Sequence, residues 1–489
     1  MSMESAGCKG LIEKTISVKP VGVFDLLEAL DNNGIPYVSW KNNHELAKAL
    51  AGESDIDLFV PFDFRAAFTM LCAQDGWLSV HNPVAKYPWV NHLYKPDGKF
   101  KICHIHVYFK VVTGESWLKE YILPLDSWII ENRVRSVEFY VWVLSVEAQA
   151  YLFVIRHLLK GGSMSSRLLY SRELDSYREE WLQCDQDKNA VTGVKPIALE
   201  SFLAGSKLYS GGFSLPRLGT AIRFRVAASP FLRVAWWSLP ARRFISFFHR
   251  VTNKFYYRRK KVLAAGGMVV AISGVDGAGK STMLTEATDF FSSFLTVDRY
   301  HLGRPQGPVI EKLRRLFAKK VNVIGSEPSF SSDCAAVSTR KAISVMVLAI
   351  LRLRLARRAA RRAAMGHLVL VDRWPTDMVG KMDGPRIHFR EESGVLVQIC
   401  RRIEQWAYAS MPRADICFYF EIPLAVAVDR NRNRIKNDKE TDEEITARFE
   451  GNRDIQLLAR KTIRFDNAGD LAVKRKEFLW QLWAEIIKH

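Results

Sequence analysis

The feature that most constrains this chain is a glycine-rich octapeptide between an apolar run and a helix-like run. Residues 274–281 read Gly-Val-Asp-Gly-Ala-Gly-Lys-Ser and match the pattern G-x-x-x-x-G-K-S. Residues 268–272 before it predict a buried strand, and residues 281–291 after it predict a helix. Such a loop turns tightly and directs backbone N–H groups at an anion, and three glycines permit the turn: Gly274, Gly277 and Gly279. The sequence therefore predicts an α/β domain built around a phosphate-binding loop.

The residues that follow these glycines carry the chemistry of such a loop. We expect Lys280 to reach the β- and γ-phosphates of a nucleotide and the Ser281 hydroxyl to bind Mg²⁺. Thr282 adds a second hydroxyl at the start of the helix. The loop thus predicts ATP and Mg²⁺ as ligands.

The loop sequence, with an acidic residue two places after its first glycine, resembles the loop of thymidylate kinases. The similarity continues in the correct order over residues 265–489. Segments similar to later parts of that family occur at residues 300–307, 311–317, 368–373, 414–427, 429–434 and 463–468. The resemblance implies a parallel sheet flanked by helices and phosphoryl transfer from ATP to a nucleoside monophosphate, such as dTMP, or a related phosphorylated acceptor.

The resemblance also implies roles for individual side chains. Asp276 would orient the acceptor, Asp372 would hold a magnesium-bound water, and Arg373 would clamp a phosphate. Arg304 would bind the acceptor phosphate, because phosphoryl transfer needs positive charge around the moving group.

Three further groups complete the implied site. The helix expected at residues 343–364 would present either Arg352 or Arg354 to the acceptor. The lid would close over the γ-phosphate with Arg430, Arg432 and Arg434. The loop after the last strand would carry adenine through Asn467 and Ala468.

Three stretches depart from the thymidylate kinase pattern. They are Leu-Gly-Arg-Pro at 302–305, Asp-Arg-Trp-Pro-Thr-Asp at 372–377 and Asp-Gly-Pro-Arg at 383–386. These departures leave the acceptor open. Two alternatives stand beside the kinase: a bifunctional nucleotide or sugar-nucleotide enzyme of surface-glycan metabolism, and a nucleotide-gated binding module for polyanions.

The first part of the chain carries a second short motif. Residues 52–58, Gly-Glu-Ser-Asp-Ile-Asp-Leu, resemble the Asp-x-Asp strand of the nucleotidyltransferase fold. Alternate strand positions place Asp55 and Asp57 on one face, where two carboxylates hold metal. Either His104 or His106 stands where that family has a third carboxylate. We therefore expect weak Mg²⁺ binding and weak or absent nucleotide transfer.

The chain is expected to divide into a nucleotidyltransferase-like α+β domain at 1–160, a basic helical connector at 161–264 and the kinase-like domain at 265–489. A helix is predicted at 146–160, and strands at 101–110 and 136–143. The connector interleaves arginine and aromatic residues over 231–261. One interpretation is helices that pack aromatic side chains between two domains, and the other is contact with a membrane surface or a polyanion. A homodimer is a further expectation.

Composition narrows the setting. A net charge of +19 and a pI near 9.6 imply attraction to polyanions. The seven cysteines are scattered and form no close pair, which fits a reducing compartment. The first residues lack the apolar core of a secretory signal, and the longest apolar run, 343–351, is too short to cross a bilayer. The predicted location is the cytoplasm, with the inner face of the membrane as a peripheral site.

Overall fold

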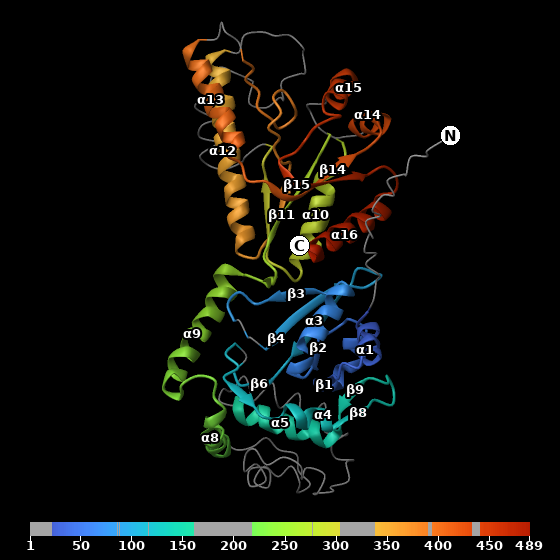
Figure 1. Ribbon diagram of the computed structural model, residues 1–489, viewed down its shortest axis with the longest axis vertical. Coiled ribbons are helices and arrows are strands. Elements are labelled where there is room, and N and C mark those ends of the chain that lie inside the picture. Colours follow the sequence, from blue (N-terminus) through green and yellow to red (C-terminus); the bar gives the residue numbers. More distant parts are fainter. Residues whose placement is uncertain are drawn as a thin grey trace, which may run out of the picture. The chain divides into compact units, whose positions relative to one another are not determined.

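Two compact units make up the chain (Figure 1). The first comprises Met1–Leu78, Tyr87–Phe248 and Trp483–Lys488, and the second comprises Ser79–Lys86, His249–Leu482 and His489. The domain boundaries expected from the sequence stay a prediction. The computed structural model describes residues 22–85, 87, 89–115, 117–160, 218–275, 277–303, 338–389, 394–432 and 441–489. Three predicted site residues lie outside these ranges: Asp276, Arg304 and Arg434.

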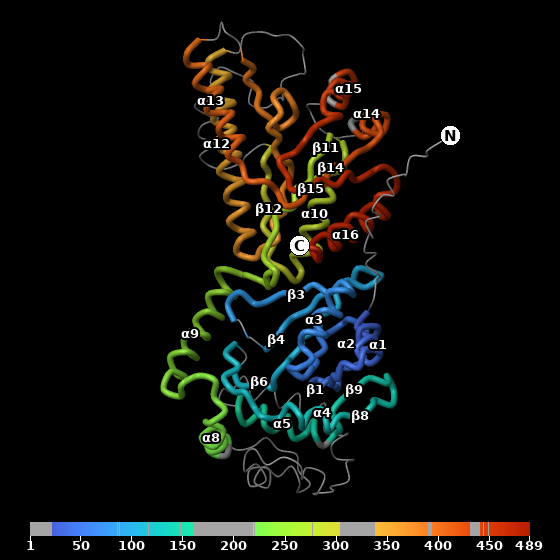
Figure 2. The backbone as a smooth tube through the Cα atoms, in the orientation of Figure 1, coloured from blue at the N-terminus to red at the C-terminus, as the bar shows by residue number. Residues whose placement is uncertain are grey.

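The second unit is built on a five-stranded sheet in the order β12-β13-β11-β14-β15, with every neighbouring pair parallel. The apolar strand β11 (Met268–Gly274) lies at its centre and is buried along its whole length. Figure 2 shows β11 beside β14. The other strands are β12 (Val297–His301), β13 (Leu368–Asp372), β14 (Ala414–Glu421) and β15 (Ala459–Asp466). The predicted α/β class with a parallel sheet is confirmed.

Helices cover this sheet. Small residues on α12 (Thr339–Ala364), among them Ala356, Ala359 and Ala363, pack against buried valines of β11 and β13. On α16 (Leu471–Lys488), Phe478 makes edge contacts with Phe418 and Phe420 of β14. The remaining helices of this unit are α10 (Lys280–Ser292), α13 (Val395–Ala409), α14 (Leu424–Arg432) and α15 (Asp442–Gly451). A short antiparallel pair, β3 (Leu78–His81) with β10 (Val262–Leu263), also joins residues of this unit.

The first unit contains a mixed sheet whose strands run in the order β4-β5-β2-β1-β9-β8. The strands are β1 (Val38–Lys41), β2 (Ile56–Phe59), β4 (Val90–Pro96), β5 (Ile102–Tyr108), β8 (Arg133–Arg135) and β9 (Trp142–Leu144). A separate two-stranded sheet joins β6 (Val111–Thr113) to β7 (Tyr121–Leu123). Helices accompany them: α1 (Val23–Asn32), α2 (Leu46–Leu50), α3 (Arg65–Gln74), α4 (Asp126–Glu131) and α5 (Val146–Lys160).

Two sequence expectations for this unit have different outcomes. The helix predicted at 146–160 is confirmed as α5. The strand predicted at 136–143 is wrong over most of its length, because the chain turns there between β8 and β9. Ser136 donates its N–H to the Val141 carbonyl, and Tyr140 has a left-handed φ of 54°.

Part of the expected connector belongs to the first unit. Helix α8 (Leu218–Ala227) inserts Phe224 into the core formed with α5, and Arg225 Nε donates to the Leu158 carbonyl at 3.0 Å. Helix α9 (Leu239–Thr252) follows. Within the described ranges, every helix is too short or too polar to span a bilayer.

Candidate functional site

The phosphate-binding loop adopts the strand–loop–helix arrangement that the sequence predicts. Strand β11 ends at Gly274, and α10 begins at Lys280 directly after Gly279, whose φ of 81° is left-handed. Gly274, at φ 142°, lies so close to the backbone of Phe420 that a Cβ atom would clash with it. The loop therefore requires glycine on conformational grounds at one end and on packing grounds at the other.

Lys280 is buried and folds back over the loop. Its Nζ donates to the carbonyls of Gly274 at 2.8 Å and Val275 at 2.7 Å. These two neutral acceptors satisfy two of the donors of a buried ammonium group. Phosphate oxygens are stronger acceptors for the same group, because they carry charge.

Helix α14 and the end of β15 meet at this loop. Arg430 of α14 donates from Nη1 to the Gly277 carbonyl at 3.4 Å and from Nη2 to the Asn467 carbonyl at 3.2 Å. Asn467 in turn donates from Nδ2 to the Ala278 carbonyl at 2.6 Å, and a Cβ atom at Gly279 would lie 2.5 Å from that Nδ2. Three segments that the sequence assigns to one nucleotide thus converge in the fold.

Other predicted residues lie on these three segments or directly next to them. Ala468 follows Asn467, and its N–H is bonded to Asp466 Oδ1 at 2.9 Å. Thr282 is exposed on the first turn of α10. Arg432 ends α14, and the described part of the chain does not include its side chain.

Asp372, at the carboxyl end of β13, faces the start of α10. Its Oδ2 lies 3.5 Å from Ser281 Oγ and 3.3 Å from His301 Nδ1. Among the described residues, its buried Oδ1 has no hydrogen-bond partner. A buried carboxylate oxygen with spare lone pairs beside a serine hydroxyl matches the oxygen ligands that Mg²⁺ and its bound waters prefer. The residues present therefore fit a magnesium site.

The ionisation of Asp372 supports this fit. Burial raises the pKa of Asp372, but the hydrogen bond from His301 and the positive charges of Lys280 and Arg373 outweigh burial and leave the pKa below its usual value. The group is consequently an anion at neutral pH, as a magnesium ligand must be.

Arg373 follows Asp372 in a strained conformation. Its φ of 67° is left-handed, and its N–H donates to the Ile272 carbonyl at 2.9 Å. A Cβ atom at Gly303 would lie 2.6 Å from Arg373 Cδ, so the arginine side chain passes directly over that glycine. Its Nη1 lies 3.7 Å from Asp383 Oδ2, which holds the guanidinium near the ends of β11 and β13. Strain of this kind is commonly found where a side chain must be aimed at a ligand.

Arg352 has a different position from the one expected. All five N–H groups of its buried guanidinium have protein acceptors: the carbonyls of Leu302, Gly303 and Asp383, the hydroxyl of Tyr408, and Asp383 Oδ1 at 2.6 Å. The geometry gives Arg352 a structural task and does not present it to an acceptor. Arg354 is exposed. Because it is two residues from Arg352 on the same helix, its side chain points to the opposite side of α12.

Two residues of this site were missed from the sequence as site residues. His301 ends β12 and contacts Asp372, and Asp383 lies between Arg352 and Arg373. The place of His301 at the carboxyl end of a parallel strand was the available signal. For Asp383 the sequence offers only a departure of residues 383–386 from the thymidylate kinase pattern.

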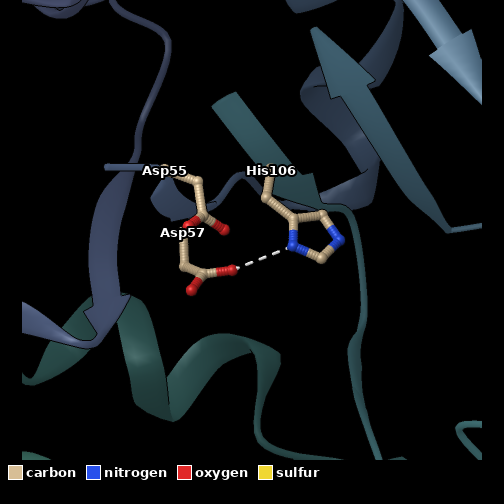
Figure 3. A group of neighbouring side chains, drawn as sticks. All are labelled: Asp55, Asp57 and His106. Atoms are coloured by element: carbon tan, nitrogen blue, oxygen red, sulfur yellow. Dashed lines mark ion pairs between the residues drawn. The ribbon is translucent and has the colours of Figure 1, made fainter. Parts of the chain in front are cut away.

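A second cluster lies in the first unit (Figure 3). Ligand atoms of Asp55, Asp57 and His106 all lie within 4.8 Å of one another. The parallel register of β2 and β5 places Asp57 opposite His106, and Asp57 Oδ1 lies 3.1 Å from His106 Nδ1. His104 instead approaches His92, with Nε2 3.1 Å from His92 Nδ1. Of the two histidines that the sequence left open, His106 therefore belongs to the cluster.

Lys41 changes what this cluster can bind. Its Nζ lies 2.9 Å from Asp57 Oδ1, while Asn42 Nδ2 donates to Asp57 Oδ2 at 2.8 Å. Burial raises the pKa of Asp57, but the larger combined effect of Lys41 and His106 lowers it. The net pKa lies well below the usual value for an aspartate, so the carboxylate is ionised. Burial lowers the pKa of His106 to about 3, and its ring is neutral at pH 7. A metal ion would have to displace the Lys41 ammonium from its partner.

Comparisons with known proteins give distant likenesses. No protein-family model matches the chain. Over 171 residues, 25% are identical to an Escherichia coli K12 protein described as "Uncharacterized ATP-binding protein YghR", covering 33% of this chain and 68% of that protein. The same values hold for its counterpart in Escherichia coli O6:H1.

Solved structures of thymidylate kinases are also similar. The Candida albicans enzyme is 14% identical with a TM-score of 0.28, covering 46% of this chain and 92% of its own. The Ehrlichia chaffeensis enzyme is 13% identical with a TM-score of 0.25, covering 44% of this chain and 98% of its own. Because these TM-scores are low, the fold assignment rests on the loop, the strand order and the contacts described above.

The contacts of Arg352 generate a stability prediction. Arg352→Met should lower the free energy of unfolding by about 3–5 kcal/mol, because the buried Asp383 carboxylate loses its closest cation. Arg354→Met, two residues away on the exposed side, should change it by less than about 0.5 kcal/mol. Urea unfolding followed by circular dichroism measures both. Equal stability of the two variants would contradict the structural task assigned to Arg352.

Proposed function

We propose that the second unit is an ATP-dependent kinase that transfers a phosphoryl group to a nucleoside monophosphate or a related phosphorylated acceptor. The observation that carries this proposal is the meeting of Lys280, Ser281, Asp372 and Arg373 at the carboxyl ends of β11 and β13. Ligands bind at this end of an open parallel sheet. The likeness to an ATP-binding protein and to thymidylate kinases agrees with it.

Each side chain has a task in this proposal. Lys280 exchanges the carbonyls of Gly274 and Val275 for the β- and γ-phosphates. Ser281 would bind Mg²⁺ and Asp372 would hold a water of that ion, whose charge would neutralise the phosphate oxygens. These groups stabilise charge that develops during transfer, and the protein forms no covalent bond with the phosphoryl group in this scheme.

The acceptor side depends on arginine. Arg373, oriented by Asp383, binds the acceptor or transferred phosphate through its planar guanidinium. Arg430 already touches the loop and the Asn467 carbonyl, and it closes the nucleotide site as a lid. Asp276, Arg304 and Arg434 are proposed in the same roles as their motif positions imply, and they lie outside the described residues.

The two alternative functions predict different results in an activity assay. A bifunctional enzyme would also transfer a nucleotide in the first unit, and a nucleotide-gated binding module would bind ATP without acceptor-dependent turnover. Purified protein should therefore be mixed with ATP, Mg²⁺ and a panel of nucleoside monophosphates and sugar phosphates. ADP release that requires one acceptor supports the kinase. ATP binding without such release from any acceptor would favour the binding module.

Lys280→Ala should lower kcat by roughly 10²–10³-fold, about 3–4 kcal/mol of transition-state stabilisation, because a preorganised charge at the transferred group is lost. ADP release with the best acceptor measures the effect. Lys476→Ala, which removes an exposed lysine of α16, is the matched control and should retain wild-type turnover. Wild-type turnover by the Lys280→Ala protein would end the kinase proposal.

Arg373→Lys should be nearly as damaging as Arg373→Ala. A lysine keeps the positive charge but lacks the planar fork that binds two phosphate oxygens at once. Steady-state kinetics for both acceptor and ATP would locate the loss in kcat or in KM. Near-normal kinetics of the lysine variant would show that Arg373 supplies charge alone.

The paired replacement Asp55→Asn, Asp57→Asn should leave acceptor-dependent ADP release unchanged within about twofold, since the cluster belongs to the other unit. The wild-type chain should bind Mg²⁺ weakly there, because Lys41 already neutralises Asp57. Labelled nucleoside triphosphates and candidate acceptors test for transfer in the full chain. Robust nucleotide transfer that disappears in the paired variant would establish the bifunctional enzyme.

A further inference from the structure

The segment before the phosphate-binding loop has an unusual charge pattern. Residues 201–275 contain no aspartate or glutamate. Within 231–261 the sequence carries nine basic residues: Arg233, Arg242, Arg243, Arg250, Lys254, Arg258, Arg259, Lys260 and Lys261. The same stretch carries nine aromatic residues: Phe231, Trp236, Trp237, Phe244, Phe247, Phe248, Phe255, Tyr256 and Tyr257. Its charge is complementary to an anionic partner over its whole length.

Polar side chains attach this segment to the first unit. Arg243 of α9 pairs with Glu120 at 2.6 Å, and that carboxylate is completely buried. One turn later, Ser246 Oγ donates to Glu115 Oε2 at 3.4 Å. Ahead of the helix, Arg233 donates from Nε and Nη2 to two backbone carbonyls of the loop that contains Glu115 and Glu120. One side of α9 is thereby fixed on its own unit.

The apolar side chains of α9 lie on another side. Phe244, Phe247, Phe248 and Val251 follow the i, i+3, i+4, i+7 spacing of a single helix face. Phe244 is 70% exposed and Phe247 is 63% exposed. A 3₁₀ turn before the helix, Trp236–Ser238, adds two tryptophans that are more than 70% exposed. In the part of the chain that the structure describes, all of these side chains are exposed.

An anionic phospholipid surface is the partner that fits both properties. Tryptophan and phenylalanine on one side of a helix insert at the boundary between headgroups and acyl chains, while arginine and lysine contact the lipid phosphates. Exposed basic side chains accompany the face along the chain: Arg242 within α9, and Arg258, Arg259 and Lys260 in the residues that follow the helix. The phosphates of a nucleic acid could pair with the basic side chains. A nucleic acid, however, has no continuous apolar layer that would bury the row of phenylalanines on α9.

We propose that α9 and the Trp236–Trp237 pair form an interfacial helix that docks this protein on an anionic phospholipid bilayer. The face buried in the lipid is that of Phe244 and Phe247, and the side that carries Arg243 stays attached to the first unit. This inference is independent of the proposed kinase activity, because it concerns binding of the protein to a membrane and no step of phosphoryl transfer.

The test is cosedimentation of the full chain with vesicles of phosphatidylcholine alone or with about one-third phosphatidylserine. Binding should require phosphatidylserine and weaken as salt increases, because ionic contacts are screened. The variant Phe244→Ser, Phe247→Ser should lower the partition coefficient at least tenfold. The matched control is Val137→Ser, Tyr140→Ser, which removes two exposed apolar side chains of the same unit and should bind like wild type.

Three other results would each overturn the proposal. One is equal vesicle binding by the Phe244→Ser, Phe247→Ser protein and wild type. Another is failure of the wild-type chain to sediment with either vesicle. If size-exclusion chromatography then shows a dimer that the phenylalanine variant loses, the apolar face binds a second copy of the chain and not lipid. The third is a single-stranded DNA oligonucleotide binding more tightly than vesicles and independently of the phenylalanines. Thermal unfolding and ADP release are measured for every variant to check that it remains folded. A loss of lipid binding can then be distinguished from a loss of kinase activity.

Discussion

One buried guanidinium organises the acceptor side of the candidate kinase site. Arg352 joins the loop after β12, the segment after β13 and helix α13, because its acceptors are carbonyls of the first two and the Tyr408 hydroxyl of the third. Asp383, held by Arg352, in turn has its Oδ2 3.7 Å from Arg373 Nη1. The orientation of Arg373 therefore depends in part on a buried arginine whose N–H groups all bond to protein acceptors.

The two halves of the site differ in how far the sequence predicts them. The phosphate-binding loop is local: glycine spacing, a preceding apolar strand and a following helix lie within about two dozen residues, and the structure has each of them. The contacts of Arg352 span up to 56 residues of chain. No spacing rule connects such distant positions, so the sequence leaves either Arg352 or Arg354 as the arginine expected at the acceptor. The strand expected at 136–143 failed for a local reason, since a residue with left-handed φ at Tyr140 makes a turn within an apolar run.

The first unit shows how one residue changes the meaning of a motif. Asp55 and Asp57 have the spacing of a metal-binding strand, and His106 joins them as the register of two parallel strands requires. Yet the neighbouring strand β1 places the Lys41 ammonium against Asp57. An internal cation occupies the electrostatic role that a divalent ion has elsewhere. The sequence alone does not connect Lys41 with Asp57, because only the pairing of β1 with β2 brings the two side chains together.

The burial of Glu120 has a mechanical consequence. Its carboxylate accepts hydrogen bonds from the Glu115 N–H and from Arg243, so that moving α9 away would leave a charge in the interior without its cation. The part of α9 up to Phe248 is consequently fixed on the first unit. A flat surface that receives its apolar face would meet the unit at a single tilt. Molecules confined to that surface would then approach the unit from one fixed direction, instead of sampling all of its sides by free rotation.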